Sequence, residues 1–256
     1  MGAGDRKDIL YILLTVSLFI VIGIYLAFTQ GQSLSNVVLI PFRTNSATPT
    51  PIEAIEVIEG SEDYFAKVET NLGVFVIDLL ESNAPNSVES FVYLSESGYY
   101  DNTSFHRFIP DFLLQGGSRN SLTPDKSDDK YGNPGYVIDD EINWESLEVD
   151  DNKKKILEGE GYTSKQGIQS IKIDKYVVAW ANSSPNTNGS QFFIVLGDSN
   201  DQKTMDLEGR HTVFGKIVEG QALFDEISKM QVNLDNLEEP RPSKDIVIKT
   251  ITIEKR

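Results

Sequence analysis

The sequence predicts a mainly β domain, a closed β-barrel capped at its ends by two α-helices, preceded by a transmembrane helix. Three observations support this fold class. Short runs of β-branched and aromatic residues separated by turn residues recur from residue 64 onward, two segments show helical patterns, and one long apolar run lies near the N-terminus. Many short strands with few helices are typical of closed antiparallel architectures.

The apolar run, ILYILLTVSLFIVIGIYLAF, occupies residues 9–28 and carries no charge. Twenty helical residues rise about 30 Å, the thickness of a hydrocarbon core. Arg6 and Lys7 precede the run, and the next basic residue is Arg43. Positive charge favours the cytoplasmic side. We therefore expect a cell-membrane protein with a single span, residues 1–8 in the cytoplasm and the remaining chain extracytoplasmic.

Two other interpretations of residues 9–28 are a cleaved secretory signal and a buried helix of a globular domain. The run is longer than the usual apolar part of a signal peptide, and no clear small-x-small cleavage site follows it. A globular helix should show a polar face, which this run lacks. The sequence favours the uncleaved anchor.

Residues 29–63 are polar and contain TNSATPTP followed by an acidic stretch. Such a composition cannot bury enough apolar surface to offset chain entropy, so it predicts an extended linker. The globular domain is then predicted at residues 64–256.

Within this domain, YFAKVET and VFVIDLL flank a turn at residues 71–73 and predict a hairpin. Pro85 near the start and Gly98 at the end delimit a helix. A second helix, QALFDEISKM, follows Gly220. The remaining predicted strands are FHRFI (105–109), FLLQ (112–115), VVAWA (177–181), QFFIVL (191–196), TVFGKIV (212–218) and DIVIKTITIEK (245–255).

Between residues 118 and 175 the periodic pattern weakens, which predicts a long loop insertion. Its DDNKKKILEGEG portion, residues 150–161, is expected to be solvated and briefly helical. Long insertions in compact domains are often functional. The sequence leaves open whether this one is a tolerated surface insertion or an additional contact surface.

Composition excludes several classes of function. The formal net charge is −16, whereas nucleic-acid binding needs lysine and arginine to neutralise phosphates. The absence of cysteine excludes disulfides, thiolate zinc sites and cysteine nucleophiles. His106 and His211 are the two histidines, too few for a histidine-rich metal site. We expect no metal, no cofactor and no nucleic-acid partner.

Three blocks bring together arginine, aromatic and amide side chains: FHRFIPDFLLQGG (105–117), WANSSPNTNGSQFF (180–193) and LEGRHTVFGKIVEG (207–220). Such a set suits the twisting of a prolyl peptide bond, which needs no nucleophile, metal or coenzyme. In this order the blocks resemble the cyclophilin family of peptidyl-prolyl cis-trans isomerases. The resemblance covers residues 64–256 and implies an eight-stranded antiparallel barrel with two capping helices.

The resemblance also implies roles for individual residues. Arg107 is expected to be the catalytic arginine, with Gln115 beside it to orient the guanidinium. His106 is expected to be structural, because adjacent strand residues point to opposite faces. The residues expected to bind the substrate are Phe112, Leu113, Ala181, Asn182, Gln191, Phe193, Leu207 and His211.

Elementary chemistry supports an arginine in this role. Rotation about a peptide bond destroys its resonance, which creates a barrier of about 18–20 kcal/mol and leaves a localised lone pair on the prolyl nitrogen. A guanidinium beside that nitrogen can donate a hydrogen bond that is stronger in the twisted state than in the planar one. Arginine keeps its proton in proteins, so it would act electrostatically.

The predicted function is therefore a membrane-tethered, extracytoplasmic foldase that isomerises X-Pro bonds in proteins and peptides. The alternatives are a noncatalytic module that binds proline-containing segments or acts as a chaperone, and a purely structural anchor. Where many family members have tryptophan, this sequence has Asp206, which argues against binding of cyclosporin. Trp180 stands where methionine is common and is expected to alter the packing below the groove.

Overall fold

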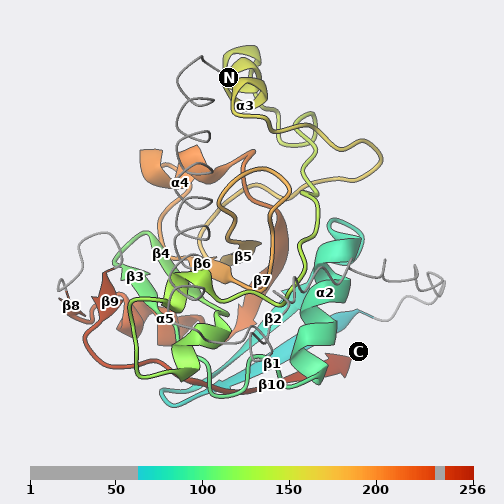
Figure 1. Ribbon diagram of the computed structural model, residues 1–256. Coiled ribbons are helices and arrows are strands. Elements are labelled where there is room, and N and C mark those ends of the chain that lie inside the picture. The colour runs from blue at the N-terminus through green and yellow to red at the C-terminus, as the bar shows by residue number, and fades with distance from the viewer. Residues whose placement is uncertain (1–62, 234–239) are drawn as a thin grey trace, which may run out of the picture. The chain divides into compact units, whose positions relative to one another are not determined.

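The structure is a computed structural model that describes residues 63–233 and 240–256 (Figure 1). Its main feature is one antiparallel sheet of eight strands, in the order β10-β1-β2-β7-β5-β6-β4-β3. A small second sheet pairs β8 (Val232–Asn233) with β9 (Arg241–Pro242). The strands of the main sheet are β1 (Tyr64–Thr70), β2 (Val74–Leu79), β3 (Arg107–Ile109), β4 (Leu113–Gly116), β5 (Val177–Trp180), β6 (Phe192–Val195), β7 (Val213–Glu219) and β10 (Ile248–Lys255).

The mainly β prediction is confirmed, and the predicted hairpin is present as β1 and β2. Alternation along the strands separates two hydrophobic clusters. On β6, Phe192 and Ile194 belong to the large central cluster, whereas Phe193 and Val195 belong to a smaller cluster on the opposite face. Both sets are almost fully buried. The sheet therefore has one face turned to the main core and a second, partly covered face.

The two predicted helices are present and pack on the main core. Helix α2 (Pro85–Glu96) inserts Phe91, whose ring lies 5.1 Å from that of Phe214 and 5.6 Å from that of Phe192. Helix α5 (Gln221–Ile227) contributes Phe224, which contacts the ring of Phe75 edge-on at 4.9 Å. Aromatic burial of this kind dominates core energetics.

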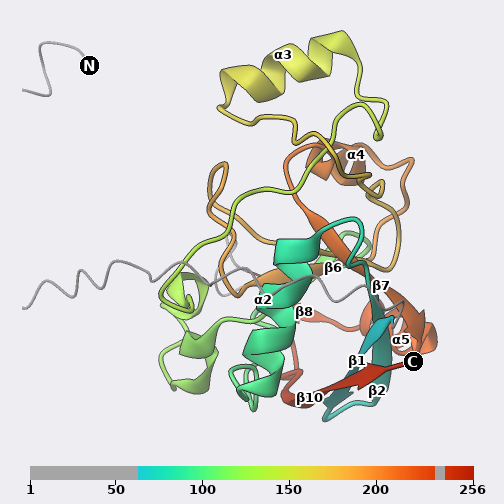
Figure 2. The ribbon, with the colours of Figure 1, turned by 90° about the vertical axis from the view of Figure 1, so that its right-hand side faces the viewer.

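Four further helical segments lie in regions that the sequence did not assign as helix or described only as briefly helical. Figure 2 shows α3 above α4 at one end of the molecule. These segments are the 3-10 turns η2 (Arg119–Leu122) and η3 (Asp129–Tyr131) and the helices α3 (Asp151–Gly159) and α4 (Gln202–Leu207).

The prediction of a closed barrel is wrong. The sheet is curled but open, with β10 and β3 as its two edges. The segment before β3 approaches β10 at an isolated bridge between Ser104 and Val247. Three backbone hydrogen bonds support this contact: Asn102 N–H to the Ile248 carbonyl at 2.7 Å, Ile248 N–H to the Thr103 carbonyl at 2.8 Å, and Phe105 N–H to the Ile246 carbonyl at 2.9 Å. Strand β3 has three residues, and the Phe108 N–H donates to the Pro240 carbonyl at 2.7 Å. The Phe108 N–H is therefore bonded to the loop that contains Pro240 and does not pair β3 with β10.

The predicted membrane localisation is also corrected. Along residues 63–233 and 240–256, no helix combines the length and the apolar character needed to cross a bilayer. This finding contradicts the expected single-pass protein with an extracytoplasmic domain. The predicted segments 1–8, 9–28 and 29–63 lie outside the described residues, apart from Asp63, and the boundaries of the insertion at 118 and 175 stay predictions.

Two glycines with positive φ differ in how closely other atoms approach them. Gly220, between β7 and α5, has φ +87°, and a Cβ there would lie 2.6 Å from the Val74 carbonyl oxygen and 2.9 Å from the Phe75 Cα. Gly135 has φ +90° with nothing within 4 Å. Alanine at either position meets the left-handed backbone penalty of about 1–2 kcal/mol. At Gly220, but not at Gly135, a clash with the backbone of β2 adds to this penalty.

We predict that Gly220→Ala lowers the free energy of unfolding by about 2 kcal/mol more than Gly135→Ala, because overpacking typically costs about 1–3 kcal/mol. Urea unfolding monitored by circular dichroism gives both values. Equal losses for the two variants would show that the contact with β2 is not tight.

Candidate functional site

The predicted catalytic arginine lies in a row of residues across four strands. Arg107 on β3 pairs with Gln115 on β4, Gln115 pairs with Phe193 on β6, and Phe193 pairs with Ala179 on β5. Directly paired residues in neighbouring strands point to the same face of a sheet. Because Phe193 and Ala179 belong to the smaller cluster, Arg107 lies on that face and not in the main core.

A relay of hydrogen bonds fixes the side chains of this row. Arg107 Nη1 donates to Gln115 Oε1 at 3.3 Å, and Gln115 Nε2 donates to Gln191 Oε1 at 3.1 Å. Gln191 Nε2 in turn donates to the carbonyl oxygens of Lys130 and Gly132, both at 2.9 Å. The two carbonyls accept only, so they set the orientation of both amides and turn the Gln115 oxygen toward the guanidinium.

Lys130 and Gly132 belong to the insertion and were not anticipated from the sequence. Backbone acceptors carry no side-chain signature, so no residue pattern marked them. In addition, the weak periodic pattern of residues 118–175 gave no basis for predicting where Lys130 and Gly132 lie.

Beside this row lies an open pocket of about 500 Å³. Three of the predicted binding residues, Phe112, Leu207 and His211, line it. Phe193 packs against the pocket residue His211, with the two rings 5.1 Å apart in an edge-on arrangement. Phe193 and Leu113 are only 2% and 3% exposed and belong to the buried cluster against which Phe112 and Leu207 pack. The pocket is also lined by Lys203 and Arg210, which the sequence did not single out, and by Asp206, which it singled out as unfavourable for cyclosporin.

The imidazole of His211 is held in one tautomer. Its Nδ1 lies 3.0 Å from the Trp180 carbonyl, which only accepts, so Nδ1 carries the proton and Nε2 is an acceptor. Burial is the main cause that lowers the pKa of His211 from 6.5 to about 4; the charge of Arg210 also lowers it, and the hydrogen bond to the Trp180 carbonyl opposes the shift. The ring is therefore neutral near neutral pH and offers an apolar face to the pocket.

The loop after β5 connects the pocket to the amide relay. The Ala181 N–H donates to the Gln191 carbonyl at 2.9 Å, and Asn182 Nδ2 donates to the Arg210 carbonyl at 2.9 Å. The side chain of Asn182 is thus engaged within the protein. Asp140, which the sequence analysis did not single out, orders the following turn by accepting from Asn188 Nδ2 at 2.8 Å.

His106 and Trp180 are both buried. His106 is 1% exposed, and burial together with Arg241 lowers its pKa to about 4. Trp180 is fully buried in the main core, where its ring stacks on that of Phe214 at 4.4 Å. The structural role expected for His106 came from strand alternation and the packing role expected for Trp180 came from the resemblance, and both stay predictions.

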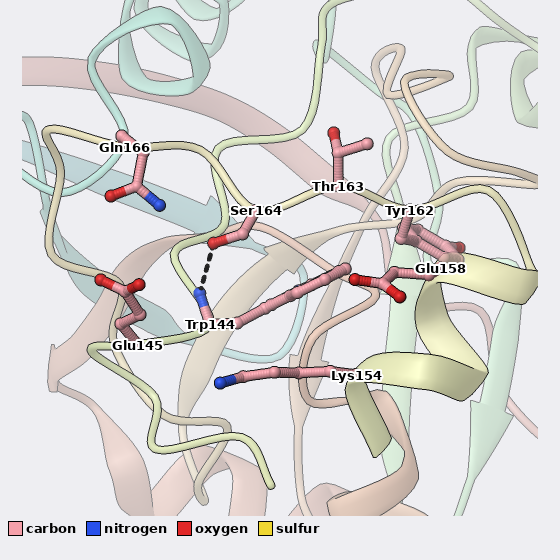
Figure 3. Close-up of a pocket in the computed structure, with 8 residues that line it drawn as sticks. All are labelled: Trp144, Glu145, Lys154, Glu158, Tyr162, Thr163, Ser164 and Gln166. Atoms are coloured by element: carbon pink, nitrogen blue, oxygen red, sulfur yellow. Dashed lines mark hydrogen bonds between the residues drawn. The ribbon is translucent and has the colours of Figure 1, made fainter. Parts of the chain in front are cut away.

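A second pocket, of about 260 Å³, lies in the insertion next to α3 (Figure 3). Its lining includes Trp144, Tyr162 and Ser164. The Ser164 hydroxyl accepts a hydrogen bond from the Trp144 N–H at 3.0 Å, so it is engaged in holding the loop. Within the described ranges, no group of three or more acidic, histidine or cysteine side chains could hold a metal ion.

Comparison with known proteins decides the family. Residues 65–253 match the family model for cyclophilin type peptidyl-prolyl cis-trans isomerases. The chain belongs to the cyclophilin family. This confirms the resemblance carried by the three sequence blocks.

Several curated cyclophilins are similar to this chain. Peptidyl-prolyl cis-trans isomerase B of Streptomyces anulatus is 32% identical over 211 residues, which cover 77% of this chain and 99% of that protein. CYP18-2 of Arabidopsis thaliana is 32% identical over 68% of this chain and 84% of its own length. Peptidyl-prolyl cis-trans isomerase-like 2 of Cryptococcus neoformans is 35% identical over 74% of this chain, but the match spans only 27% of that longer protein.

A solved structure agrees with the sequence matches. A cyclophilin type isomerase of Cryptosporidium parvum superposes with a TM-score of 0.56 at 28% identity, covering 76% of this chain and 99% of that one. The same protein has been crystallised in the presence of the dipeptide Ala-Pro, with a TM-score of 0.55.

The lowered pKa of His211 leads to a prediction about pH. Protonation of His211 sets in only as the pH falls toward about 4, so its ring stays uncharged between about pH 5 and 8. We expect the catalysed exchange rate of a prolyl peptide, measured by NMR, to be constant over that range. The histidine Cε1–H resonances, with His106→Gln to assign them, check the titration directly. A step in rate or chemical shift with a midpoint near the ordinary pKa of 6.5 would contradict it.

Proposed function

We propose that this cyclophilin isomerises X-Pro bonds in proteins and peptides, with Arg107 as the catalytic residue and Gln115 fixing its position. The observation that carries the proposal is the orientation of the guanidinium by the amide relay on the same sheet face as the pocket. The apolar parts of the pocket suit a proline ring, and concave, largely apolar sites with a few polar groups are typical of ligand sites.

The mechanism follows from the electronic change during rotation. In the planar peptide the prolyl nitrogen is a poor acceptor, because its lone pair is shared with the carbonyl. As the bond twists, the lone pair localises on nitrogen and accepts a hydrogen bond from Arg107. The guanidinium thus binds the twisted state more strongly than either planar isomer, which is the condition for catalysis. No proton is transferred, because arginine remains charged throughout.

Immobilisation of the proline ring supplies the second part of the mechanism. Phe112, Leu207 and the neutral ring of His211 would contact the pyrrolidine, while the residue before the proline rotates. The loop at Ala181 and Asn182 and the amide of Gln191 would align the substrate backbone. Uncatalysed isomerisation takes tens to hundreds of seconds, and an acceleration of about five decades requires about 7 kcal/mol. One charged hydrogen bond together with alignment is of that order.

The substrate class follows from the same features. The pocket is open at the surface, so it can accept a proline within a longer chain as well as in a short peptide. We propose unfolded or flexible proline-containing segments of proteins as the substrates. No cofactor enters the mechanism.

We predict that Arg107→Ala lowers kcat/KM for an Ala-Pro peptide by about a hundred-fold or more, because loss of one preorganised donor typically has that effect. Arg107→Lys keeps the charge but loses the planar fork that Gln115 orients, so it should recover only part of the rate. NMR exchange spectroscopy of the peptide with residues 63–256 measures all three proteins.

Arg256→Ala is the matched control. Arg256 lies beyond the end of β10 and pairs at the surface with Glu219 and Glu254, so its loss should leave the rate unchanged. A wild-type protein that binds the peptide without accelerating exchange would reject the proposal and favour the noncatalytic binding module. Equal rates for wild type and Arg107→Ala would reject the role of Arg107.

A further prediction concerns cyclosporin. Asp206 lines the pocket, and its carboxylate accepts a hydrogen bond from Gln202 Nε2 at 2.8 Å. An apolar cyclic peptide that covers this rim would remove water from the carboxylate, which is unfavourable. We expect Asp206→Trp to tighten cyclosporin binding about ten-fold or more, since an indole adds apolar area and a donor.

Asp206→Ala separates the two causes, because it removes the charge without adding the indole and should give a smaller gain. Isothermal titration calorimetry gives the three dissociation constants. A wild-type affinity equal to that of Asp206→Trp would show that Asp206 does not disfavour the ligand.

A further inference from the structure

The insertion contains a folded element with its own small core. Its hydrophobic cluster is separate from the two clusters of the sheet. Asp150 caps the N-terminus of helix α3, because its carboxylate accepts from the N–H groups of Asn152 and Lys153, and the helix contributes the fully buried Leu157. The cluster comprises Ile142, Trp144, Leu147, Val149, Leu157 and Tyr162.

This element lies against the segment that forms one side of the isomerase pocket. We call residues 205–211 the pocket wall, because they include the end of α4 and carry Leu207 and His211 into the pocket. Figures 1 and 2 both show α3 next to α4. Between the end of α4 at Leu207 and the start of β7 at Val213 the wall has no helix or strand of its own.

A two-pronged ion pair joins α3 to the wall. Arg210 Nε lies 2.8 Å from Glu160 Oε2, and Arg210 Nη2 donates to Glu160 Oε1 at 2.9 Å. The third guanidinium nitrogen, Nη1, donates to the Asp206 carbonyl at 2.6 Å. Bidentate pairs of this kind fix geometry as well as charge. Glu160 therefore holds Arg210 in the conformation in which its guanidinium also bonds to the Asp206 carbonyl within the wall.

Two backbone carbonyls of the wall also accept hydrogen bonds from the insertion. Lys153 Nζ donates to the Met205 carbonyl at 2.6 Å, and Trp144 Nε1 donates to the Gly209 carbonyl at 3.4 Å. The donors come from α3 and from the loop that precedes it. Contacts thus reach the wall at its start, near its middle and at Arg210.

Apolar packing completes the contact. Gly209 has φ +86°, and a Cβ on it would lie 2.7 Å from Leu157 Cδ1. The Leu157 side chain thus packs directly on the Gly209 backbone. Because Leu157 also belongs to the insertion's core, the position of the wall depends on whether that core is intact.

We propose that α3 braces the pocket wall, and that Glu160 is a positioning residue that sets the affinity of the isomerase site for proline-containing segments. The inference rests on the proposed function of that site. Leu207 and His211 hold the proline ring, so a wall that moves outward binds the ring less well. Arg107 lies on β3 and is oriented from the other side by Gln115, so the twisting step itself is unaffected.

The test is Glu160→Gln, which removes the charge and one carboxylate oxygen while keeping the length of the side chain. NMR titration and exchange spectroscopy of an Ala-Pro peptide give the dissociation constant and the turnover rate separately. We expect the dissociation constant to rise about three-fold and the turnover rate at saturation to stay within a factor of about two, as for loss of one partly exposed ion pair. In about 1 M NaCl the difference should shrink, because exposed pairs are screened.

Glu158→Gln is the matched control, since it makes the same change two residues away on α3. Glu158 lines the second pocket, whereas Glu160 forms the ion pair with Arg210 of the wall. Its dissociation constant should equal that of the wild type, and Glu160→Asp should restore part of the affinity. Equal effects of the two glutamine variants would overturn the proposal, because they would indicate a general loss of helix stability.

Leu157→Ala tests the apolar contact and should weaken peptide binding about ten-fold, with hydrogen exchange rising at residues 205–211. An unchanged dissociation constant in Glu160→Gln would overturn the brace while leaving the isomerase intact. A loss confined to turnover would overturn it as well. An inactive wild-type protein would instead reject the proposed function on which the inference rests.

Discussion

The feature on which the site depends is the relay from two backbone carbonyls through two amides to one guanidinium. A guanidinium on a flexible stem loses much of its catalytic value, because its orientation must be fixed before it can favour a transient acceptor. Here Gln191 is fixed by two carbonyls, Gln115 by Gln191, and Arg107 by Gln115. Each bond sets the orientation of the next amide, so the donor is positioned before a substrate arrives.

The same strands that place this relay also build the core. On β4 and β6, alternate residues face the main core, and the residues between them carry the site. Phe192 is packed among core aromatics, whereas its neighbour Phe193 supports His211. A shift of one residue in register would exchange the two faces, which would bury polar site residues and expose core residues. Stability of the core therefore enforces the geometry of the site.

The sequence predicted the parts of this arrangement that depend on local pattern. Arg107, Gln115 and Phe193 stand in predicted strand motifs, and alternation along the first motif set Arg107 apart from His106. Their common face depends on the register between strands, which the structure supplies. It did not predict the open sheet, because the use of the Phe108 N–H by Pro240 depends on a contact between distant segments. The carbonyls of Lys130 and Gly132 were missed for the same reason. The apolar run at 9–28 suggested a membrane location from composition alone, whereas none of the helices in residues 63–233 and 240–256 is long and apolar enough to cross a bilayer.

The insertion shows how a polar segment with a weak periodic pattern can adopt a defined structure. Few of its residues are apolar, yet Leu157 and Trp144 supply a small core, and Asp150 caps the one helix. Its contacts with the pocket wall are individually weak, because exposed ion pairs and single hydrogen bonds each contribute about 1 kcal/mol or less. A short segment without regular structure needs several such contacts to adopt one conformation. Their spread along the wall, from Met205 to Arg210, fits a role in ordering the pocket better than a role in stabilising the sheet.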